Sequence, residues 1–453
     1  MFNSKIIFLA LIFIYSTISF GRASNLQKYA PKKFFCENSL CNYVDFQKAT
    51  YNITYDLLKR SSYVESTIEF ISEGEGMPIF DLVPSIKNGK VKVDGKEVDV
   101  LTFKDADGVS TLRAAKILLS EGPHELKIIH EIDRGFIVDE KGLRAAFWMT
   151  DLSDRGYLER YLPTNLEFDQ YQININLELK NYTGKQDVFT NGNVQQISNN
   201  KWKITYPKFY TCSSLFFHTV PKNTYPISKF EFSSISGKII PVTIYVKKES
   251  QLEAFKRETI KVVKEYERDF GPWPHERIII YGAGSGGMEY SGATMTSLRA
   301  LGHELNHSYF ARGIMPSNGN TGWIDEAIAS WRDDGSKMAR RASPPSSGLG
   351  AHSQYRRTTD YGAYSKGARF MEVLNLLFKN KGGLKSFLAS LVETKMYQSI
   401  NVMEFKKLAE DFHGNNLDTI FNKTIFGKGP RWVSEKENPY HPILTQKQLD
   451  KLL

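Results

Sequence analysis

The chain has little cysteine: Cys36, Cys41 and Cys212 are the only three among 453 residues. Their number and spacing exclude a zinc site built from cysteine. In an oxidising compartment Cys36 and Cys41 could close a small disulfide loop, although the count allows other pairings equally well. The sequence alone therefore leaves the disulfide pairing open.

The sequence also lacks any RNA- or DNA-binding motif and any internal repeat. Its formal net charge is +9, but the positive residues are scattered along the chain. Scattered charge of this kind predicts a solvated basic surface. We therefore expect no nucleic-acid partner.

Long apolar runs are scarce, and the only one lies at the N-terminus, over Ile6–Phe20. It follows a positive charge at Lys5 and precedes small residues, which predicts a secretory signal peptide cleaved after Gly21 or Ala23. An uncleaved membrane anchor is the alternative. No later segment is apolar enough to span a bilayer, so we expect a secreted or periplasmic protein with no stable membrane insertion after cleavage.

The rest of the chain changes character near residue 240. From about residue 51 to 232, short β-rich runs alternate with turn residues, and "KVKVDGKEVDV" predicts a hairpin. Beyond it, residues 250–270 have helical periodicity, "RIIIYG" reads as a buried strand, and the chain from Thr296 onward is mostly helical. We expect a signal peptide over 1–23, an all-β domain over 24–240 and a second domain over 241–453, which together make an α+β protein.

Glycines 282, 284 and 287 in "GAGSGGMEY" fit the spacing of a dinucleotide-binding turn. Such a turn needs a helix directly after the glycines, and an acidic residue ending a second strand about 20 residues later. Here a β-branched, polar segment follows instead, and the later position falls inside a predicted helix. The context excludes nucleotide binding.

The segment "HELNH" carries the strongest chemical signal. On a helix, His303 and His307 lie one turn apart on the same face, so both imidazoles can reach one metal ion. Glu304 can then act as the base that takes a proton from water. Glu326 follows His307 with eighteen residues between them, in an apolar helix-forming run. A carboxylate from a second helix is the expected third ligand, and the set predicts one Zn²⁺ per chain.

The ordered segments "GGMEY", "HELNH", "WIDEAIASW" and "YSKG" resemble the motifs of the aminopeptidase N family of zinc aminopeptidases. The resemblance covers nearly the whole mature chain and is most specific from residue 260 to 370. It implies an N-terminal β-sandwich or saddle-like domain and a mainly helical thermolysin-like catalytic domain with a small β-sheet. The helical C-terminal domain of larger family members is expected to be absent.

The resemblance also implies roles for single residues. Glu289 would bind the free α-amino group of a peptide, with Asp151 as a possible second amine ligand. The backbone of Gly286 and Gly287 would hold the substrate chain. The hydroxyl of Tyr364 would stabilise the oxyanion.

Two residues and two spacers depart from the family pattern. "GGMEY" has Tyr290 where Asn is usual, and "WIDEA" has Asp325 where Asn is common; the spacers after Glu289 and Glu326 are also short. The loop between the Glu326 and Tyr364 segments is rich in cations and has no acidic residue from 335 to 359. We hypothesise that Arg356 or Arg357 attracts the carboxylate of a peptide, against the simpler reading of a solvated loop.

The sequence thus predicts an exported zinc aminopeptidase that acts on peptides with a free N-terminus. Two alternatives remain. One is a zinc endopeptidase or other zinc hydrolase with altered substrate anchoring. The other is a non-catalytic peptide-binding protein of the same fold, which the joint presence of the metal and catalytic residues disfavours.

Overall fold

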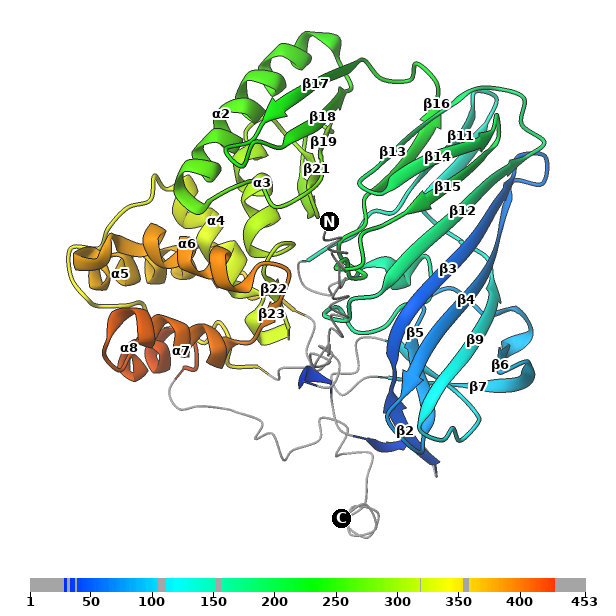
Figure 1. Ribbon diagram of the computed structural model, residues 1–453, viewed down its shortest axis with the longest axis horizontal. Coiled ribbons are helices and arrows are strands. Elements are labelled where there is room, and N and C mark those ends of the chain that lie inside the picture. The colour runs from blue at the N-terminus through cyan, green and yellow to red at the C-terminus, as the bar shows by residue number, and fades with distance from the viewer. Residues whose placement is uncertain are drawn as a thin grey trace, which may run out of the picture.

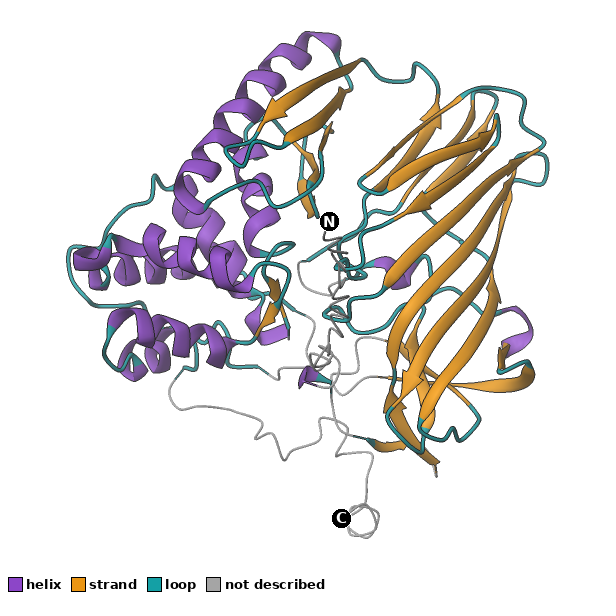
Figure 2. Ribbon diagram, viewed as in Figure 1, coloured by secondary structure: helices purple, strands orange, loops and turns teal. Residues whose placement is uncertain are grey.

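The computed structural model describes residues 28–30, 33–36, 39–104, 111–151, 156–317, 319–352 and 358–427. The predicted signal peptide lies outside these residues. Strands gather in one part of the molecule and helices in the other, as Figure 1 and Figure 2 show. An α+β protein with a large N-terminal sheet and a helical part is therefore confirmed.

The first part of the chain forms a twelve-stranded sheet and a four-stranded sheet. In spatial order the large sheet contains β1 (Phe34–Cys36), β2 (Ser39–Tyr43), β5 (Met77–Asp81), β8 (Thr111–Ala115), β7 (Lys96–Lys104), β6 (Lys90–Val93), β9 (Gly122–His130), β4 (Ser61–Ser72), β3 (Asp45–Asp56), β12 (Gln172–Lys180), β15 (Lys201–Thr205) and β14 (Asn193–Ser198). The smaller sheet contains β10 (Phe136–Asp139), β11 (Gly142–Ala146), β16 (Phe217–Pro221) and β13 (Gln186–Thr190).

Alternation of side chains explains why the long strands face one core. In β3, Tyr51, Ile53 and Tyr55 are buried while Asn52 between them is exposed. The predicted hairpin is present as β6 and β7, which pair in antiparallel fashion around Asp94 and Gly95. The central pair β3 and β12 is parallel, so two segments far apart in sequence lie side by side.

A five-stranded sheet joins the two parts. It runs in the order β17 (Ile227–Ser233), β18 (Ile239–Val246), β19 (Ile278–Gly282), β21 (Ala293–Thr296) and β20 (Gly287–Tyr290). In β19, Ile278 and Ile280 pack into the core of the helical part, and Ile279 and Tyr281 pack into the core of the β-rich part. Burial on both faces explains why this strand reads as a continuous apolar run. Because β17 pairs with β18, this sheet begins before residue 240; a domain boundary there stays a prediction.

The helical part consists of α2 (Leu252–Phe270), α3 (Leu301–Phe310), α4 (Trp323–Asp333), the π-helical turn η5 (Ala363–Gly367), α5 (Ala368–Leu377), α6 (Gly383–Lys395), α7 (Val402–His413) and α8 (Asp418–Thr424), with the short pair β22 (Met315–Pro316) and β23 (Ser399–Ile400). The predicted helix over 250–270 is confirmed as α2, which buries one stripe that includes Phe255, Val262 and Tyr266. Among the described residues, no helix is both long and apolar enough to cross a membrane.

Cys36 and Cys41 form a disulfide, which is the pairing that closes the small loop considered from the sequence. This loop connects β1 and β2 at one edge of the large sheet. Cys212 is buried in the core of the β-rich part and does not take part in the bond.

Candidate functional site

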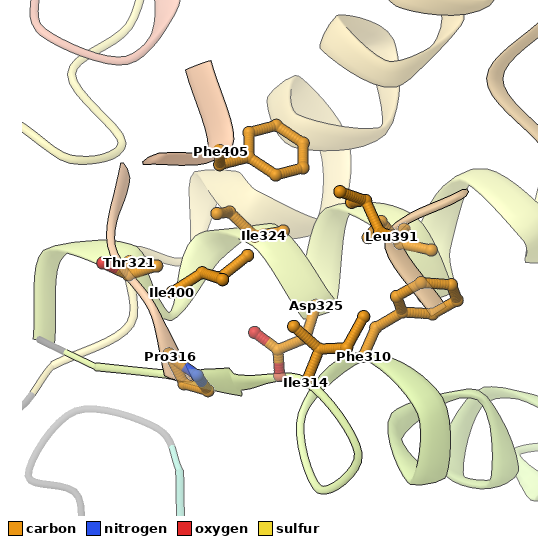
Figure 3. Close-up of a pocket in the computed structure, with 10 residues that line it drawn as sticks. Phe310, Ile314, Pro316, Thr321, Ile324, Asp325, Leu391, Ile400 and Phe405 are labelled. Atoms are coloured by element: carbon orange, nitrogen blue, oxygen red, sulfur yellow. The ribbon is translucent and has the colours of Figure 1, made fainter. Parts of the chain in front are cut away.

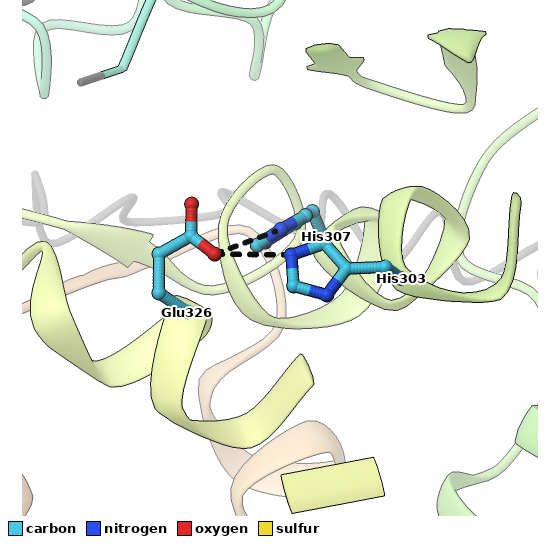
Figure 4. Close-up of side chains that lie close together, drawn as sticks. All are labelled: His303, His307 and Glu326. Carbon is cyan, nitrogen blue, oxygen red and sulfur yellow. Dashed lines mark hydrogen bonds and ion pairs between the residues drawn. The ribbon is translucent and has the colours of Figure 1, made fainter. Parts of the chain in front are cut away.

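Two neighbouring helices bring together three side chains that could hold a metal ion. His303 and His307 lie one turn apart on α3, as predicted, with ring centroids 5.0 Å apart. The following helix, α4, contributes Glu326, whose Oε2 lies 3.0 Å from Nε2 of His303 and 3.7 Å from Nε2 of His307 (Figure 4). One ligand atom from each residue therefore lies within 4.8 Å of the others.

The second nitrogen of each imidazole faces a carboxylate. Nδ1 of His303 lies 2.8 Å from Oδ2 of Asp333, and Nδ1 of His307 lies 3.3 Å from Oδ2 of Asp325. A carboxylate at Nδ1 fixes the tautomer in which Nε2 is free to bind a metal. With two imidazoles and one carboxylate, the donor set fits zinc.

Asp333 is itself held by a further ion pair. Nη1 of Arg332 lies 3.2 Å from Oδ1 of Asp333. Nη2 of Arg332 lies 2.9 Å from Oε2 of Glu265 on α2. The close packing of this guanidinium explains Gly302, because a Cβ there would lie 2.1 Å from Nη1 of Arg332. A chain of charges thus ties α2 and α4 to His303.

Asp325 also lines a mainly apolar pocket (Figure 3). The pocket is lined by Phe310, Ile314, Pro316, Thr321, Ile324, Asp325, Ile328, Leu391, Ile400 and Phe405. Apolar surroundings strengthen the electrostatic interaction between Asp325 and His307. Asp325, which departs from the family pattern, is therefore placed to orient the imidazole of His307.

Glu304 lies beside the metal-ligating residues and packs against the glycine segment. A Cβ on Gly287 would lie 1.9 Å from Oε1 of Glu304, so only glycine permits this approach. Burial raises the pKa of Glu304 to about 7, although the imidazoles of His307 and His303 oppose the shift. A carboxyl group with a pKa in this range suits a general base.

Tyr364 is the fifth residue of this centre. It lies on the π-helical turn η5, an irregularity that often occurs at functional sites. Its hydroxyl donates to Oε1 of Glu326 over 2.8 Å, and its ring stacks near that of His303 with centroids 6.0 Å apart. The structure thus brings together all five predicted metal and catalytic residues.

The two predicted amine-binding carboxylates also lie together, although they come from opposite parts of the chain. Asp151 lies between β11 and β12, and Glu289 lies on β20, yet both contact Arg312. Nη2 of Arg312 lies 2.7 Å from Oδ2 of Asp151 and 2.8 Å from Oε1 of Glu289. All three side chains are buried. Burial raises the pKa of Glu289 well above its usual range, the nearby Asp151 adds to the shift, and Arg312 opposes it. Glu289 adjoins the candidate metal site, because ligand atoms of Glu289, Glu304 and His307 lie within 4.8 Å of one another.

The glycine segment ends in an edge strand. Gly286 has a positive φ of 73°, and Gly287 begins β20, which is the last strand of the five-stranded sheet. Instead of the helix of a nucleotide-binding turn, the antiparallel pair β20 and β21 follows. The outer backbone edge of β20 can therefore pair with an extended chain.

Arg356 and Arg357 lie outside the described residues, so their proposed contact with peptide carboxylates stays a prediction. Two functional residues escaped sequence reasoning. Asp333 lies seven residues after Glu326, two helical turns along the same face of α4, and this spacing was a usable signal. Arg312 stands in the apolar segment "SYFARGIM", where a buried cation requires carboxylate partners.

Comparisons with known proteins bear on the fold. No protein-family profile matches the chain, and no curated protein sequence matches it. Among solved structures, the M1 zinc metallopeptidase from Deinococcus radiodurans matches with a TM-score of 0.61 and 16% identity, over 87% of this chain and 95% of that one. A form of it bound to a Tyr-Ser-Ala substrate matches with a TM-score of 0.62 and 15% identity, over 87% and 96%.

Aminopeptidase A from Legionella pneumophila, solved in complex with aspartic acid, matches with a TM-score of 0.64 and 13% identity. This match covers 85% of the present chain but only 50% of the Legionella protein, so the chain spans half the length of that larger enzyme. The same fold has been described as a two-domain M1 zinc metallopeptidase in a structure with L-arginine bound. The chain therefore has the fold of the M1 zinc metallopeptidases, in the extent of their two-domain forms.

Proposed function

We propose that this chain is a zinc-dependent aminopeptidase that removes the N-terminal residue from peptides with a free α-amino group. The observation that carries the proposal is the short distance between the expected amine ligand and the expected base. Glu289, an amine ligand, and Glu304, a base, have carboxylate oxygens within 4.8 Å of each other and of His307. The α-nitrogen and the first carbonyl carbon of a peptide are separated by two bonds of about 1.5 Å each. An ammonium bound at Glu289 therefore presents the first peptide bond to the base.

His303, His307 and Glu326 would hold the metal, with Asp333 and Asp325 keeping the two imidazoles in the ligating tautomer. A zinc ion held by these residues would lower the pKa of a water and polarise the scissile carbonyl. In this scheme Glu304 accepts a proton from the attacking water and delivers it to the leaving nitrogen as the C–N bond breaks. The hydroxyl of Tyr364 donates to the carbonyl oxygen as it gains negative charge.

Substrate binding would use the edge of the five-stranded sheet. The backbone of Gly286 and Gly287 would pair with the extended peptide beside β20, while Glu289 and Asp151 bind its ammonium. Arg356 or Arg357 would attract the C-terminal carboxylate of short peptides. In this proposal residues 24–240 form the all-β domain and residues 241–453 the thermolysin-like catalytic domain.

We also propose that the protein is exported, with residues 1–23 as the signal peptide. Support comes from the bond between Cys36 and Cys41, because disulfides persist in oxidising compartments such as a periplasm or the extracellular space. N-terminal sequencing of the exported protein tests this: a start after Gly21 or Ala23 is expected, and an intact Met1 contradicts it.

The function is tested with one peptide in two forms, with a free and with an acetylated N-terminus. We expect release of the first residue from the free form alone, and loss of this activity with a chelator. The substitution Glu304→Gln should lower kcat by about a hundredfold or more with zinc content unchanged. Internal cleavage of both forms at equal rates would instead support an endopeptidase, and absence of any cleavage by the zinc-loaded protein would support a binding protein.

A further inference from the structure

A buried arginine occupies the centre of the proposed amine site. Arg312 lies two residues beyond α3, and its backbone N–H donates to the carbonyl of His307 over 2.8 Å. Its side chain is only 2% exposed. A cation this deeply buried costs considerable free energy unless anions surround it.

The guanidinium makes contacts with both parts of the molecule. Nη2 contacts Asp151 and Glu289, Nη1 lies 3.1 Å from Oγ of Ser213, and the group lies 5.7 Å from the ring centroid of Tyr157. The guanidinium faces Oδ2 of Asp151 and Oε1 of Glu289, so one Nη2 group contacts both carboxyl groups.

Arg312 places one positive charge between the carboxyl groups of Asp151 and Glu289. Asp325 also lies near this cluster, but its Oδ2 faces the imidazole of His307. Without Arg312, two adjacent carboxylates in a low-dielectric site would repel each other strongly.

We propose that Arg312 is a positioning residue for recognition of the substrate amine: its guanidinium holds Asp151 and Glu289 side by side as one site. This inference rests on the proposed aminopeptidase function. It makes selectivity for a free N-terminus depend on a residue that contacts neither the metal ligands' side chains nor the scissile bond.

The test compares Arg312→Gln, Arg312→Lys and the double variant Asp151→Asn/Arg312→Gln, with Arg299→Gln as a control on an exposed arginine just before α3. For each zinc-loaded protein, KM and kcat are measured on the free peptide, and cleavage of the acetylated peptide is measured beside it. We expect Arg312→Gln to raise KM for the free peptide about tenfold or more, the effect of losing charged hydrogen bonds, with a smaller change in kcat. Arg312→Lys should recover part of the loss, and Arg299→Gln should behave as the parent.

The double variant separates charge balance from simple packing, because it removes one positive and one negative charge together and keeps the net charge of the site. We expect its KM to lie closer to the parent value than that of Arg312→Gln. If Arg312→Gln does not fold, the test uses Arg312→Lys and the double variant alone. A parental KM in Arg312→Lys together with a raised KM in the double variant would contradict the role of charge balance.

Unchanged selectivity for the free amine in a folded Arg312→Gln protein would also overturn the inference. That result differs from failure of the proposed function, in which the parent protein itself would not prefer the free peptide.

Discussion

The hydroxyl of Tyr364 donates to Oε1 of Glu326, while Oε2 of the same carboxylate faces the two histidines. The tyrosine therefore lies within one hydrogen bond of a proposed metal ligand, although it belongs to a different helix. This arrangement places a donor where the substrate oxygen is expected to gain charge.

We predict that Tyr364→Phe lowers kcat by about a hundredfold to a thousandfold, because it removes a donor to the oxyanion. Zinc content should stay near one per chain, since the three ligands are retained. Steady-state kinetics with parallel metal analysis checks this. A variant with parental kcat would show that the hydroxyl does not act on the substrate.

Gly287 is predicted to be required for the position of Glu304. In Gly287→Ala the new Cβ would collide with Oε1 of Glu304, which must then move. A displaced base is expected to lower kcat by about a hundredfold. Ser285→Ala, in the same exposed loop, is the matched control and should keep parental activity. Equal activity of both variants would show that Glu304 tolerates the displacement.

Asp333 is predicted to act on metal affinity through His303. Removing the charge with Asp333→Asn should weaken zinc binding about tenfold to a hundredfold, because the imidazole loses the carboxylate that orients it. Competition with a chromogenic chelator measures this affinity. Asp334→Asn, the adjacent exposed residue, is the control; an equal effect of the two substitutions would point to general electrostatics.

Buried histidines should make stability depend on pH. Burial lowers the pKa of His275 to about 4, against 6.5 for an ordinary histidine, and the pKa values of His130 and His218 are lowered to about 4 for the same reason. Above pH 6.5 neither the folded nor the unfolded state binds the proton. As the pH falls from 6.5 to 4, only the unfolded state binds it, so the free energy of unfolding decreases by about 3 kcal/mol per histidine.

Urea unfolding at several pH values tests this relation. The substitution His275→Gln should flatten the decline between pH 6.5 and 4, because one proton-binding site of the unfolded state is removed. Contributions from the metal centre are common to both proteins and cancel in the comparison. An identical slope in the variant would contradict the assignment to His275.

Local sequence patterns predict the candidate metal site on α3 and α4. The spacing of His303 and His307 fixes their common face whatever surrounds the helix, and the apolar run around Glu326 predicts a second helix. Contacts between distant segments could not be predicted in this way. The pairing of β3 with β12 and the meeting of Asp151 with Arg312 depend on tertiary packing, which leaves no periodic signal in either segment. In the sequence Asp325 is only a departure from the family pattern, because the imidazole nitrogen that it faces becomes evident only in three dimensions.

The parallel pairing of β3 and β12 has a consequence for how the chain folds. Lys48 to Asp56 align with Gln172 to Lys180, so more than a hundred residues separate the partners. Contacts of such long range are formed late, because closing a large loop costs entropy before any pairing compensates for it. Until residue 180 has been synthesised, one backbone edge of β3 has no native partner and can pair with other chains. The first half of the protein is therefore the part that we expect to be most exposed to wrong pairing during synthesis.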